Sequence, residues 1–298
     1  MIDILMATYN GANFLENQLL SLISQTNKEW RLLVHDDGSS DSTIDIVKRY
    51  MSIDNRIILI EDGIVKGNAG QNFLHLLRYS TAQYVVFCDQ DDIWFESKLQ
   101  VLLNGFSEEC IPEAVYCNAY AYNCEVITTN KVTTILRNTL SNSLFLNSGV
   151  QGCSLMFNRA LIDKLREYPN YVYMHDHLLT MAAITFGKLI YIDKSLMLYR
   201  QHSNNVTGNI STSFYERLKV FSKRKNVIID KKHYDANKSF YECYNKDMTL
   251  DQKKVFLAYL EFPRKGLIGK ILSVLKYNFR IGNSKVILLI KIMFKKTM

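Results

Sequence analysis

The chain has 298 residues, 48% of them hydrophobic, which is enough to bury one sizeable α/β core and a smaller additional region. Its six cysteines form no Cys-x-x-Cys pair and no signal peptide is recognisable, so a disulfide-stabilised secreted domain is disfavoured and reduced cytoplasmic thiols are expected. Nine of the 36 Lys and Arg residues follow position 263, and residues 264–298 contain no Asp or Glu. The net charge of +7 therefore belongs to the C-terminal tail, because 27 basic and 29 acidic residues precede it.

Predicted strands and helices alternate through the first part of the chain. The strands are short apolar runs, and the helices carry apolar residues at spacings of three and four. Strands are expected at 2–8, 30–36, 56–61 and 84–88, with helices around 14–23, 44–50 and 69–79. This β-α-β-α-β-α-β order predicts a mainly parallel sheet wound with right-handed crossovers.

The fourth predicted strand ends abruptly in the run Asp89-Gln90-Asp91-Asp92-Ile93-Trp94. Adjacent carboxylates repel one another, and the pKa of each rises unless a cation or strong donors neutralise them. Mg²⁺ and Mn²⁺ prefer oxygen ligands and commonly bind one or two carboxylates together with substrate phosphates. A divalent metal site is therefore expected here. The alternative is an acidic loop that caps the helix beginning near Glu96.

Parallel strands place their C-terminal ends along one edge of a sheet, which is the usual crevice for a nucleotide. The ends of the first, second and fourth strands, at 8–10, 36–37 and 89–92, are expected to meet there. No Gly-x-Gly-x-x-Gly follows the first strand, and the chain has no Gly-Lys-Ser/Thr loop. Because both of these phosphate-binding loops are missing, a metal ion would have to hold the phosphates.

Five motifs occur in order along the chain: Met6-Ala7-Thr8-Tyr9-Asn10-Gly11, His35-Asp36-Asp37-Gly38-Ser39, the acidic run 89–94, His175-Asp176, and Tyr199-Arg200-Gln201-His202-Ser203-Asn204-Asn205-Val206. The ordered set resembles glycosyltransferase family 2, and within it the bacterial rhamnosyltransferase-like branch. The resemblance covers about two thirds of the chain. It implies an α/β GT-A nucleotide-diphospho-sugar transferase fold, Rossmann-like and mainly parallel, at 1–210. A helical region with a basic amphipathic tail is expected at 211–298.

The resemblance implies a donor site for a nucleotide sugar. Residues matching its base and ribose pocket are Ala7, Thr8, Tyr9, Asn10 and Asp37, with a carboxylate accepting the imide N–H of uracil or thymine. Asp91 would ligate the metal directly, and Asp89 would contact the metal, through water or directly, or the ribose. Asp92 and Trp94 would support the sugar pocket, although Trp94 could equally be a core anchor. Further donor residues are expected at Gln90, Asn68, Gln71 and Asn72.

Two later segments complete the expected donor site. Gly152 lies in Gln151-Gly152-Cys153-Ser154, which resembles the family segment beneath the donor sugar, where a missing side chain permits close backbone approach. A predicted strand at 189–199 leads into a segment that would fold back over the donor. There Arg200 or His202 could meet the diphosphate, and His202 could complete the metal shell. An isolated surface histidine is the alternative for His202.

The expected catalytic base is Asp176, just before an apolar helix. It resembles the second member of the family's acidic pair at a helix start, and His175 replaces the first. A carboxylate close to a helix N-terminus and to histidine should stay ionised at neutral pH. The alternative is that Asp176 only caps the helix. His175 and His177 are expected near the acceptor or behind the base, and their spacing disfavours zinc because residues two apart on a helix do not share a face.

The basic tail is predicted to be amphipathic. From 267 to 279 one helical face is apolar and the opposite face carries Lys and Arg, while the apolar run 286–290 is far shorter than the roughly 20 residues that span a bilayer. Such a tail suits an anionic membrane surface. Packing on the catalytic domain or on a second subunit is the alternative. Nucleic acid is disfavoured because the basic residues alternate with Ile and Leu instead of stacking aromatics.

These features predict a metal-dependent enzyme, cytoplasmic and peripheral on the inner face of the membrane. It would transfer a sugar with inversion from a nucleotide diphosphate to a hydroxyl of a cell-surface polysaccharide or a lipid-linked glycan. The family resemblance makes dTDP-L-rhamnose the first choice of donor, and a UDP-hexose the second. A non-catalytic nucleotide-sugar-binding assembly subunit is the alternative from another class. A nucleotidyltransferase is disfavoured because no basic Gly-rich loop follows the first strand.

Overall fold

The computed structural model describes residues 1–107, 110–146, 150–165, 167–201 and 227–298. The chain folds into two compact units. The sheet unit comprises the described residues of 1–133, 150–162 and 190–210, and the helical unit comprises those of 134–149, 163–189 and 211–298. The domain boundary at residue 210 stays a prediction, since residues 134–149 and 163–189 also group with the C-terminal helices.

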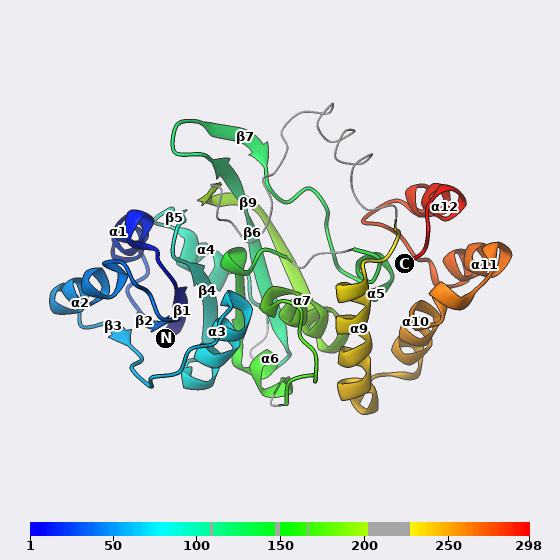
Figure 1. Ribbon diagram of the computed structural model, residues 1–298, viewed down its shortest axis with the longest axis horizontal. Helices are drawn as coiled ribbons and strands as arrows, with labels where there is room; N and C mark the ends of the chain where they lie inside the picture. The colour runs from blue at the N-terminus through cyan, green and yellow to red at the C-terminus, as the bar shows by residue number, and fades with distance from the viewer. Residues whose placement is uncertain (108–109, 147–149, 166, 202–226) are drawn as a thin grey trace. The chain divides into compact units, whose positions relative to one another are not determined.

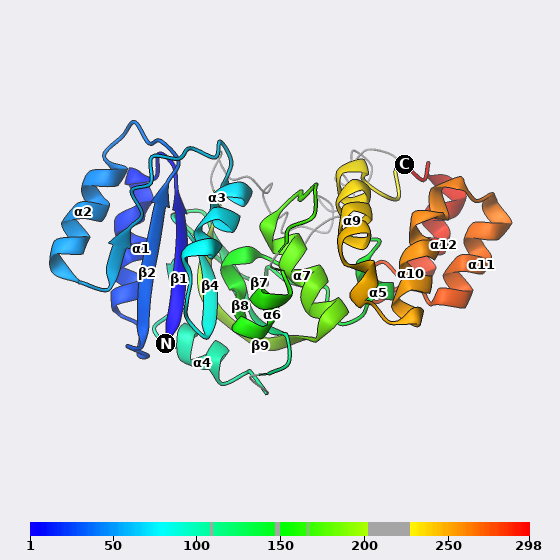
Figure 2. The ribbon, with the colours of Figure 1, turned by 90° about the horizontal axis from the view of Figure 1, so that it is seen from below.

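The first half of the sheet is parallel, as predicted. Its strands β1 (Ile2–Thr8), β2 (Trp30–Asp36), β3 (Ile57–Leu59) and β4 (Tyr84–Asp89) lie in the order β3-β2-β1-β4. The connecting helices are α1 (Ala12–Ile23), α2 (Thr43–Ile53) and α3 (Ala69–Leu76), the last continued by the 3₁₀ turn η1 (Leu77–Tyr79). Helices α1 and α2 cover one face of these strands and α3 covers the other (Figure 2). Burial on both faces explains why the strands read as continuous apolar runs.

The second half of the sheet is antiparallel where its pairings are defined. β8 (Leu155–Asn158) runs antiparallel to β4, and β6 (Glu113–Tyr122) runs antiparallel to both β8 and β7 (Ile127–Lys131). The order continues through β9 (Lys188–Arg200) to the two-residue β5 (Ile93–Trp94), which pairs antiparallel with β9. Helix α4 (Lys98–Leu103) and the 3₁₀ turn η2 (Gly152–Ser154) accompany these strands. Figure 1 shows β6 and β9 as the long strands of this half.

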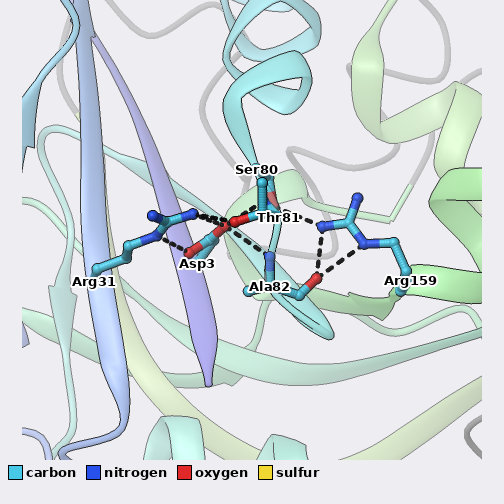
Figure 3. A network of polar contacts seen from close by, with 6 residues as sticks. All are labelled: Asp3, Arg31, Ser80, Thr81, Ala82 and Arg159. Carbon is cyan, nitrogen blue, oxygen red and sulfur yellow. Dashed lines mark hydrogen bonds and ion pairs between the residues drawn. The ribbon is translucent and has the colours of Figure 1, made fainter.

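A buried carboxylate fixes the N-terminal ends of the parallel strands. Asp3 is fully buried, and its oxygens accept hydrogen bonds from the Arg31 guanidinium at 2.6 and 3.1 Å. The Ser80 hydroxyl and the backbone N–H groups of Thr81 and Ala82 donate to it at 2.8–3.1 Å. Arg159, at the start of α6 (Arg159–Lys164), donates to the Ala82 carbonyl and the Ser80 hydroxyl (Figure 3). Burial alone would raise the pKa of Asp3, but these hydrogen bonds outweigh it and lower the pKa.

The helical unit packs around aromatic side chains. Phe145 contacts the rings of Tyr259, Phe262 and Phe279 with centroids 4.9–5.2 Å apart. Its helices are α5 (Leu140–Ser143), α7 (His175–Phe186), α9 (Lys231–Tyr244), α10 (Leu250–Leu260), α11 (Leu267–Tyr277) and α12 (Lys285–Phe294), with 3₁₀ turns at Asn245–Asp247 and Phe262–Arg264. Of the described helices, none is long and apolar enough to cross a membrane.

Candidate active site

The strand register brings the predicted site residues of the sheet unit to one edge. Ala7 of β1 pairs with His35 of β2 on one side and with Asp89 of β4 on the other. Thr8 pairs with Asp36, and its hydroxyl donates to the Asp36 carboxylate at 2.8 Å. The ends of three parallel strands therefore meet, as the chain order predicted.

The turn after β1 is held by the turn after β2. The Asn10 backbone N–H donates to the Ser39 hydroxyl, and the Asn10 side-chain oxygen accepts from the Ser40 backbone N–H, both at 2.8 Å. Asn10 adopts a left-handed φ of 46°, which Asn tolerates better than most residues. Tyr9 is 58% exposed. The Asn10 amide oxygen thus orders the two turns, while the Tyr9 ring is open to solvent.

Gln90 connects this turn to the acidic run. Its side-chain oxygen accepts from the Tyr9 backbone N–H, and its side-chain N–H donates to the Tyr9 carbonyl, each at 3.0 Å. The Gln90 oxygen also explains Gly11, because a Cβ at that position would lie 2.1 Å from it. Gln90 therefore joins the ends of β1 and β4 through backbone contacts.

Asp37 and the loop after β3 form a second part of the edge. Asp37 is 8% exposed, its backbone N–H donates to the Thr8 carbonyl at 2.8 Å, and its carboxylate accepts from the Lys66 backbone N–H. Asn68 caps α3 by accepting from the Gln71 backbone N–H at 2.9 Å, and both residues are exposed. Asn72, by contrast, is buried at 1% exposure. Loop 60–68 thus supports the Asp37 carboxylate directly.

The acidic run forms a cluster at the end of β4. Asp89 and Asp91 are half-buried, and Asp92 is fully buried. Ligand atoms of Asp89, Asp92 and Cys153 lie within 4.8 Å of one another. Burial, together with the charges of Asp89 and Asp91, raises the pKa of Asp92 well above its usual range. The repulsion between these carboxylates, and a set of possible ligand atoms made mainly of oxygen, fit a divalent ion such as Mg²⁺ or Mn²⁺.

Arg200 contacts the acidic run through both its backbone and its side chain. Its backbone N–H donates to the Asp92 carboxylate at 3.0 Å, and its Nε donates to the Asp91 carbonyl at 2.6 Å. The residue is 4% exposed, and its guanidinium lies over the rings of Phe14 and Tyr122. The last residue of β9 therefore orders the turn that follows β4. His202 and residues 203–206 of the same motif lie outside the described residues.

Asp176 lies in the first turn of α7, in the helical unit. The N-cap position is Met174, and the Asp176 carboxylate accepts from the His177 backbone N–H at 2.6 Å. Burial raises the pKa of Asp176 to about 6, against the lowering effects of that hydrogen bond and of Arg137. The shift is opposite in direction to a helix-terminus effect, because desolvation dominates. Asp176 is nevertheless mostly ionised at pH 7 and above.

The two histidines beside Asp176 are buried and neutral. Burial lowers the pKa of His175 and of His177 to about 3. The His177 ring lies against that of His233 in α9, with centroids 5.5 Å apart. Within the described chain, neither His175 nor His177 belongs to a group of three or more side chains whose ligand atoms converge. Neither histidine therefore carries a charge that would lower the pKa of Asp176, whereas Arg137 does.

The sequence matches those of known enzymes over most of its length. Residues 3–166 match the family model described as glycosyl transferase family 2. The dTDP-rhamnosyl transferase RfbG of Shigella flexneri is 32% identical over 233 residues, which cover 72% of this chain and 78% of that protein. The chain belongs to glycosyltransferase family 2.

This family 2 glycosyltransferase also has relatives of another specificity. The Escherichia coli protein named UDP-Glc:alpha-D-GlcNAc-diphosphoundecaprenol beta-1,3-glucosyltransferase WfgD is 26% identical over 215 residues, covering 70% of this chain and 80% of that protein. Staphylococcus aureus TarS 1-349 in complex with UDP-GlcNAc superposes with a TM-score of 0.62 at 17% identity, over 97% of this chain and 83% of the other. The mannosyltransferase PcManGT of Pyrobaculum calidifontis, in complex with GDP-Man and Mn²⁺, gives 0.56 at 15% identity, over 92% and 73%. The predicted family and GT-A fold are confirmed.

One buried cation near the site of this glycosyltransferase lies outside the sequence motifs. Lys98, the first residue of α4, is fully buried. Its Nζ lies 3.4 Å from the centroid of the Trp94 ring and donates to the Cys153 carbonyl at 2.6 Å. Trp94 itself is 3% exposed and belongs to the core. Lys98 thus links Trp94 to the segment that contains Gly152, which is also buried. A lysine beginning a mostly apolar helical run was the available sequence signal.

Proposed function

We propose that this protein is an inverting glycosyltransferase that transfers L-rhamnose from dTDP-L-rhamnose to a hydroxyl of a cell-surface polysaccharide or a lipid-linked glycan intermediate. The observation that carries the proposal is the similarity to a dTDP-rhamnosyl transferase across 78% of that protein. The convergence of the three strand ends at one edge supports it, because a nucleotide is expected there.

In the proposed donor complex, Ala7, Thr8, Tyr9, Asn10 and Asp37 contact the base and ribose. The exposed Tyr9 ring and the carboxylate of Asp37, supported by Lys66, are suited to that role. Asn68, Gln71 and Gly152 border the same ligand. Gln90, Asp92, Trp94 and Arg200 are proposed to hold the edge in shape, since their side chains contact other parts of the protein.

Asp91 and Asp89 are the proposed ligands of Mg²⁺ or Mn²⁺, with His202 as a further ligand. The crowded carboxylates suit a divalent ion, because its charge offsets the repulsion that, together with burial, raises the pKa of Asp92. When bound, the ion would supply positive charge to the departing diphosphate.

Asp176 is the proposed general base. With a pKa of about 6 it is ionised at neutral pH, yet basic enough to accept the proton of an acceptor hydroxyl. His175 and His177, both neutral, are proposed to border the acceptor. General-base catalysis of this kind contributes about 10²–10⁴-fold.

We further propose that the tail holds the enzyme on an anionic membrane surface on the cytoplasmic side. Helix α11 buries Ser273 and Val274, so its apolar face points to solvent. The exposed apolar residues are Leu267, Ile268, Leu272 and Leu275 on α11, and Val286, Ile287, Ile290, Met293 and Phe294 on α12. Nearby Lys and Arg residues would each add about 1 kcal/mol at such a surface.

Vesicle co-sedimentation tests the membrane proposal. Ile268→Asp and Leu272→Asp should reduce binding to phosphatidylglycerol-containing vesicles several-fold, because both place a charge on the inserted face. Leu250→Asp on α10 is the matched control, since Leu250 is 74% exposed and lies outside the tail. Equal sedimentation of all three variants, or binding to pure phosphatidylcholine alone, would contradict an anionic-surface role.

The donor is tested with a panel of dTDP- and UDP-sugars, with Mn²⁺, Mg²⁺ or chelator, on wild type, Asp91→Ala and Asp176→Asn. Metal-dependent turnover of dTDP-L-rhamnose that is lost in Asp91→Ala is the expected result. Preference for UDP-glucose, as the name of the Escherichia coli relative suggests, would keep the chemistry and replace the donor. Asp176→Asn should lose turnover but retain donor affinity; unchanged function in this variant would favour a non-catalytic nucleotide-sugar-binding subunit.

A further inference from the structure

Three side chains of the sheet unit converge behind the proposed nucleotide edge. His35 is on β2, Asp62 is in the loop after β3, and His75 is on α3. His35 Nε2 lies 3.2 Å from Asp62 Oδ1, and His75 Nε2 lies 2.5 Å from Asp62 Oδ2. The two imidazoles are 1% and 7% exposed, and their centroids are 4.9 Å apart. One ligand atom from each residue lies within 4.8 Å of the others.

The contacts of Asn72 determine where His35 carries its proton. The Asn72 side-chain N–H donates to the His35 carbonyl at 3.1 Å, which leaves the Asn72 side-chain oxygen 2.7 Å from His35 Nδ1. That oxygen can only accept, so Nδ1 must carry a proton. In the neutral ring, Nε2 then presents a lone pair to the Asp62 carboxylate. A second proton or a metal cation is needed between these two groups.

The second-proton solution fits the surroundings poorly. A second proton on His35, which is 1% exposed, would make a buried imidazolium, and burying a charged group is costly even beside a carboxylate. Asp62 already accepts from the Ile64 backbone N–H and the Tyr79 hydroxyl, at 2.9 and 2.8 Å. The carboxylate is therefore firmly held and ionised, and a single ion could satisfy both imidazole lone pairs at once.

We propose that His35 Nε2, His75 Nε2 and the Asp62 carboxylate bind a divalent transition metal ion such as Zn²⁺. Two imidazoles and one carboxylate suit such an ion, whereas Mg²⁺ takes mainly oxygen ligands. The hydrogen bond from His35 Nδ1 to the Asn72 oxygen is the contact that orients metal-binding histidines. At metal–ligand distances of about 2.0–2.1 Å, a small outward movement of Asp62 would admit the ion.

The ion would fix the loop that supports the nucleotide edge. Asp62 and Lys66 are both on loop 60–68, and the Lys66 backbone N–H holds the Asp37 carboxylate. Anchoring Asp62 to β2 and α3 would therefore hold Asp37 in place. This consequence, unlike the site itself, rests on the proposed function of Asp37.

Co²⁺ is a suitable probe, since it replaces Zn²⁺ and its visible absorption reports nitrogen and oxygen coordination. After chelation and dialysis, the full chain should bind one equivalent of Co²⁺ tightly at this site, displaced by Zn²⁺. His75→Gln and Asp62→Asn should weaken that binding by about 100-fold or more, since loss of a direct ligand exceeds the 10–100-fold effect of outer groups. Asp91→Ala should retain it, because Asp91 belongs to the other cluster. Zn²⁺ should raise the Tm of wild type but not of His75→Gln.

The result that overturns the proposal is equal Co²⁺ affinity in wild type and a folded His75→Gln variant, or no Co²⁺ binding by the folded wild-type chain. Circular dichroism establishes that each variant is folded. These readouts need no sugar donor, so failure of the metal site and failure of the proposed transferase are separate outcomes. Retained Co²⁺ binding with no donor turnover would leave this site standing and remove the transferase.

Discussion

The two ends of the parallel strands use carboxylates in opposite ways. At the N-terminal end, Asp3 is surrounded by donors, including the Arg31 guanidinium, and its pKa is lowered. At the C-terminal end, Asp89, Asp91 and Asp92 crowd together, and the pKa of Asp92 is raised by burial and by its neighbours. Both ends belong to the same parallel strands, so the contrast lies in what surrounds the carboxylates. A cluster of carboxylates that repel one another within the fold is typical of a ligand-binding site.

The largest expected effect is at the C-terminal end. Asp91→Ala should reduce kcat/KM by about 10³-fold or more, because loss of a metal ligand removes several kcal/mol of stabilisation from the transition state. The Tm of the metal-free variant should equal or exceed that of wild type, because one repelling charge is gone. Turnover assays and thermal unfolding in chelator measure the two quantities. A large fall in Tm would show that Asp91 holds the fold, and would remove the contrast between the ends.

Asp3→Ala should have the opposite signature. Removing one partner of a buried ion pair typically costs about 3–5 kcal/mol of unfolding free energy. Denaturant unfolding should detect this loss, while kcat measured well below the Tm stays near wild type. Glu61→Ala is the control, because Glu61 pairs with Lys48 at an exposed site and should change stability by under about 1 kcal/mol. If Asp3→Ala matched this control, the N-terminal network would be dispensable.

Local sequence patterns predicted one end of the sheet well. The apolar runs of β1, β2 and β4 and their polar ends are properties of consecutive residues, so the meeting of Thr8, Asp36 and Asp89 followed from strand order alone. The antiparallel half was not predicted, because the pairing of β8 with β4 and β6 depends on contacts between distant segments. The same holds for the hydrogen bond from Arg200 to Asp92, which joins residues 108 positions apart.

The degree of burial of individual side chains was the second feature that the sequence did not predict. A helix N-terminus and neighbouring histidines predict that Asp176 stays ionised at neutral pH, but they do not predict that desolvation raises its pKa to about 6. Lys98 was missed because a lysine at a helix start is usually solvated. The apolar face of α11 was recognisable, but sequence periodicity does not say that this face would point to solvent.

A smaller effect is expected where the two strand-end turns touch. Gly11→Ala places a Cβ 2.1 Å from the Gln90 side-chain oxygen, so Gln90 must release the Tyr9 backbone. The cost is that of the two hydrogen bonds from Gln90 to the Tyr9 backbone, about 0.5–1.5 kcal/mol each, and the donor KM should rise because the turn shifts. Gly266→Ala is the control, since nothing lies within 4 Å of a Cβ there.

A double variant identifies the cause of the Gly11→Ala effect. Gln90→Ala removes the clashing atoms, so adding it to Gly11→Ala should cost less stability than it costs in wild type. Double-mutant-cycle analysis of denaturant unfolding gives that coupling. Simple additivity would mean that the two side chains do not compete for the same space.

The smallest expected effect separates the two ends by the sign of their pH dependence. The folded pKa of Asp92 is raised, so between its unfolded value near 3.8 and its folded value the native state binds more protons than the unfolded state, and stability falls as pH rises. Asp92→Asn keeps the acceptor for the Arg200 backbone N–H and has no proton to bind. In chelator it should therefore be more stable than wild type at pH 7, with the difference shrinking toward pH 4.

Asp3 has a lowered pKa, so its contribution is present above pH 3.8 and is lost as pH falls through the folded pKa. Asp3→Asn should accordingly be less stable than wild type at pH 7, with the gap closing only at lower pH. Stability curves of the two variants that run in the same direction would mean that Asp92 is ionised and neutralised within the fold, as Asp3 is, and that the C-terminal cluster is part of the scaffold.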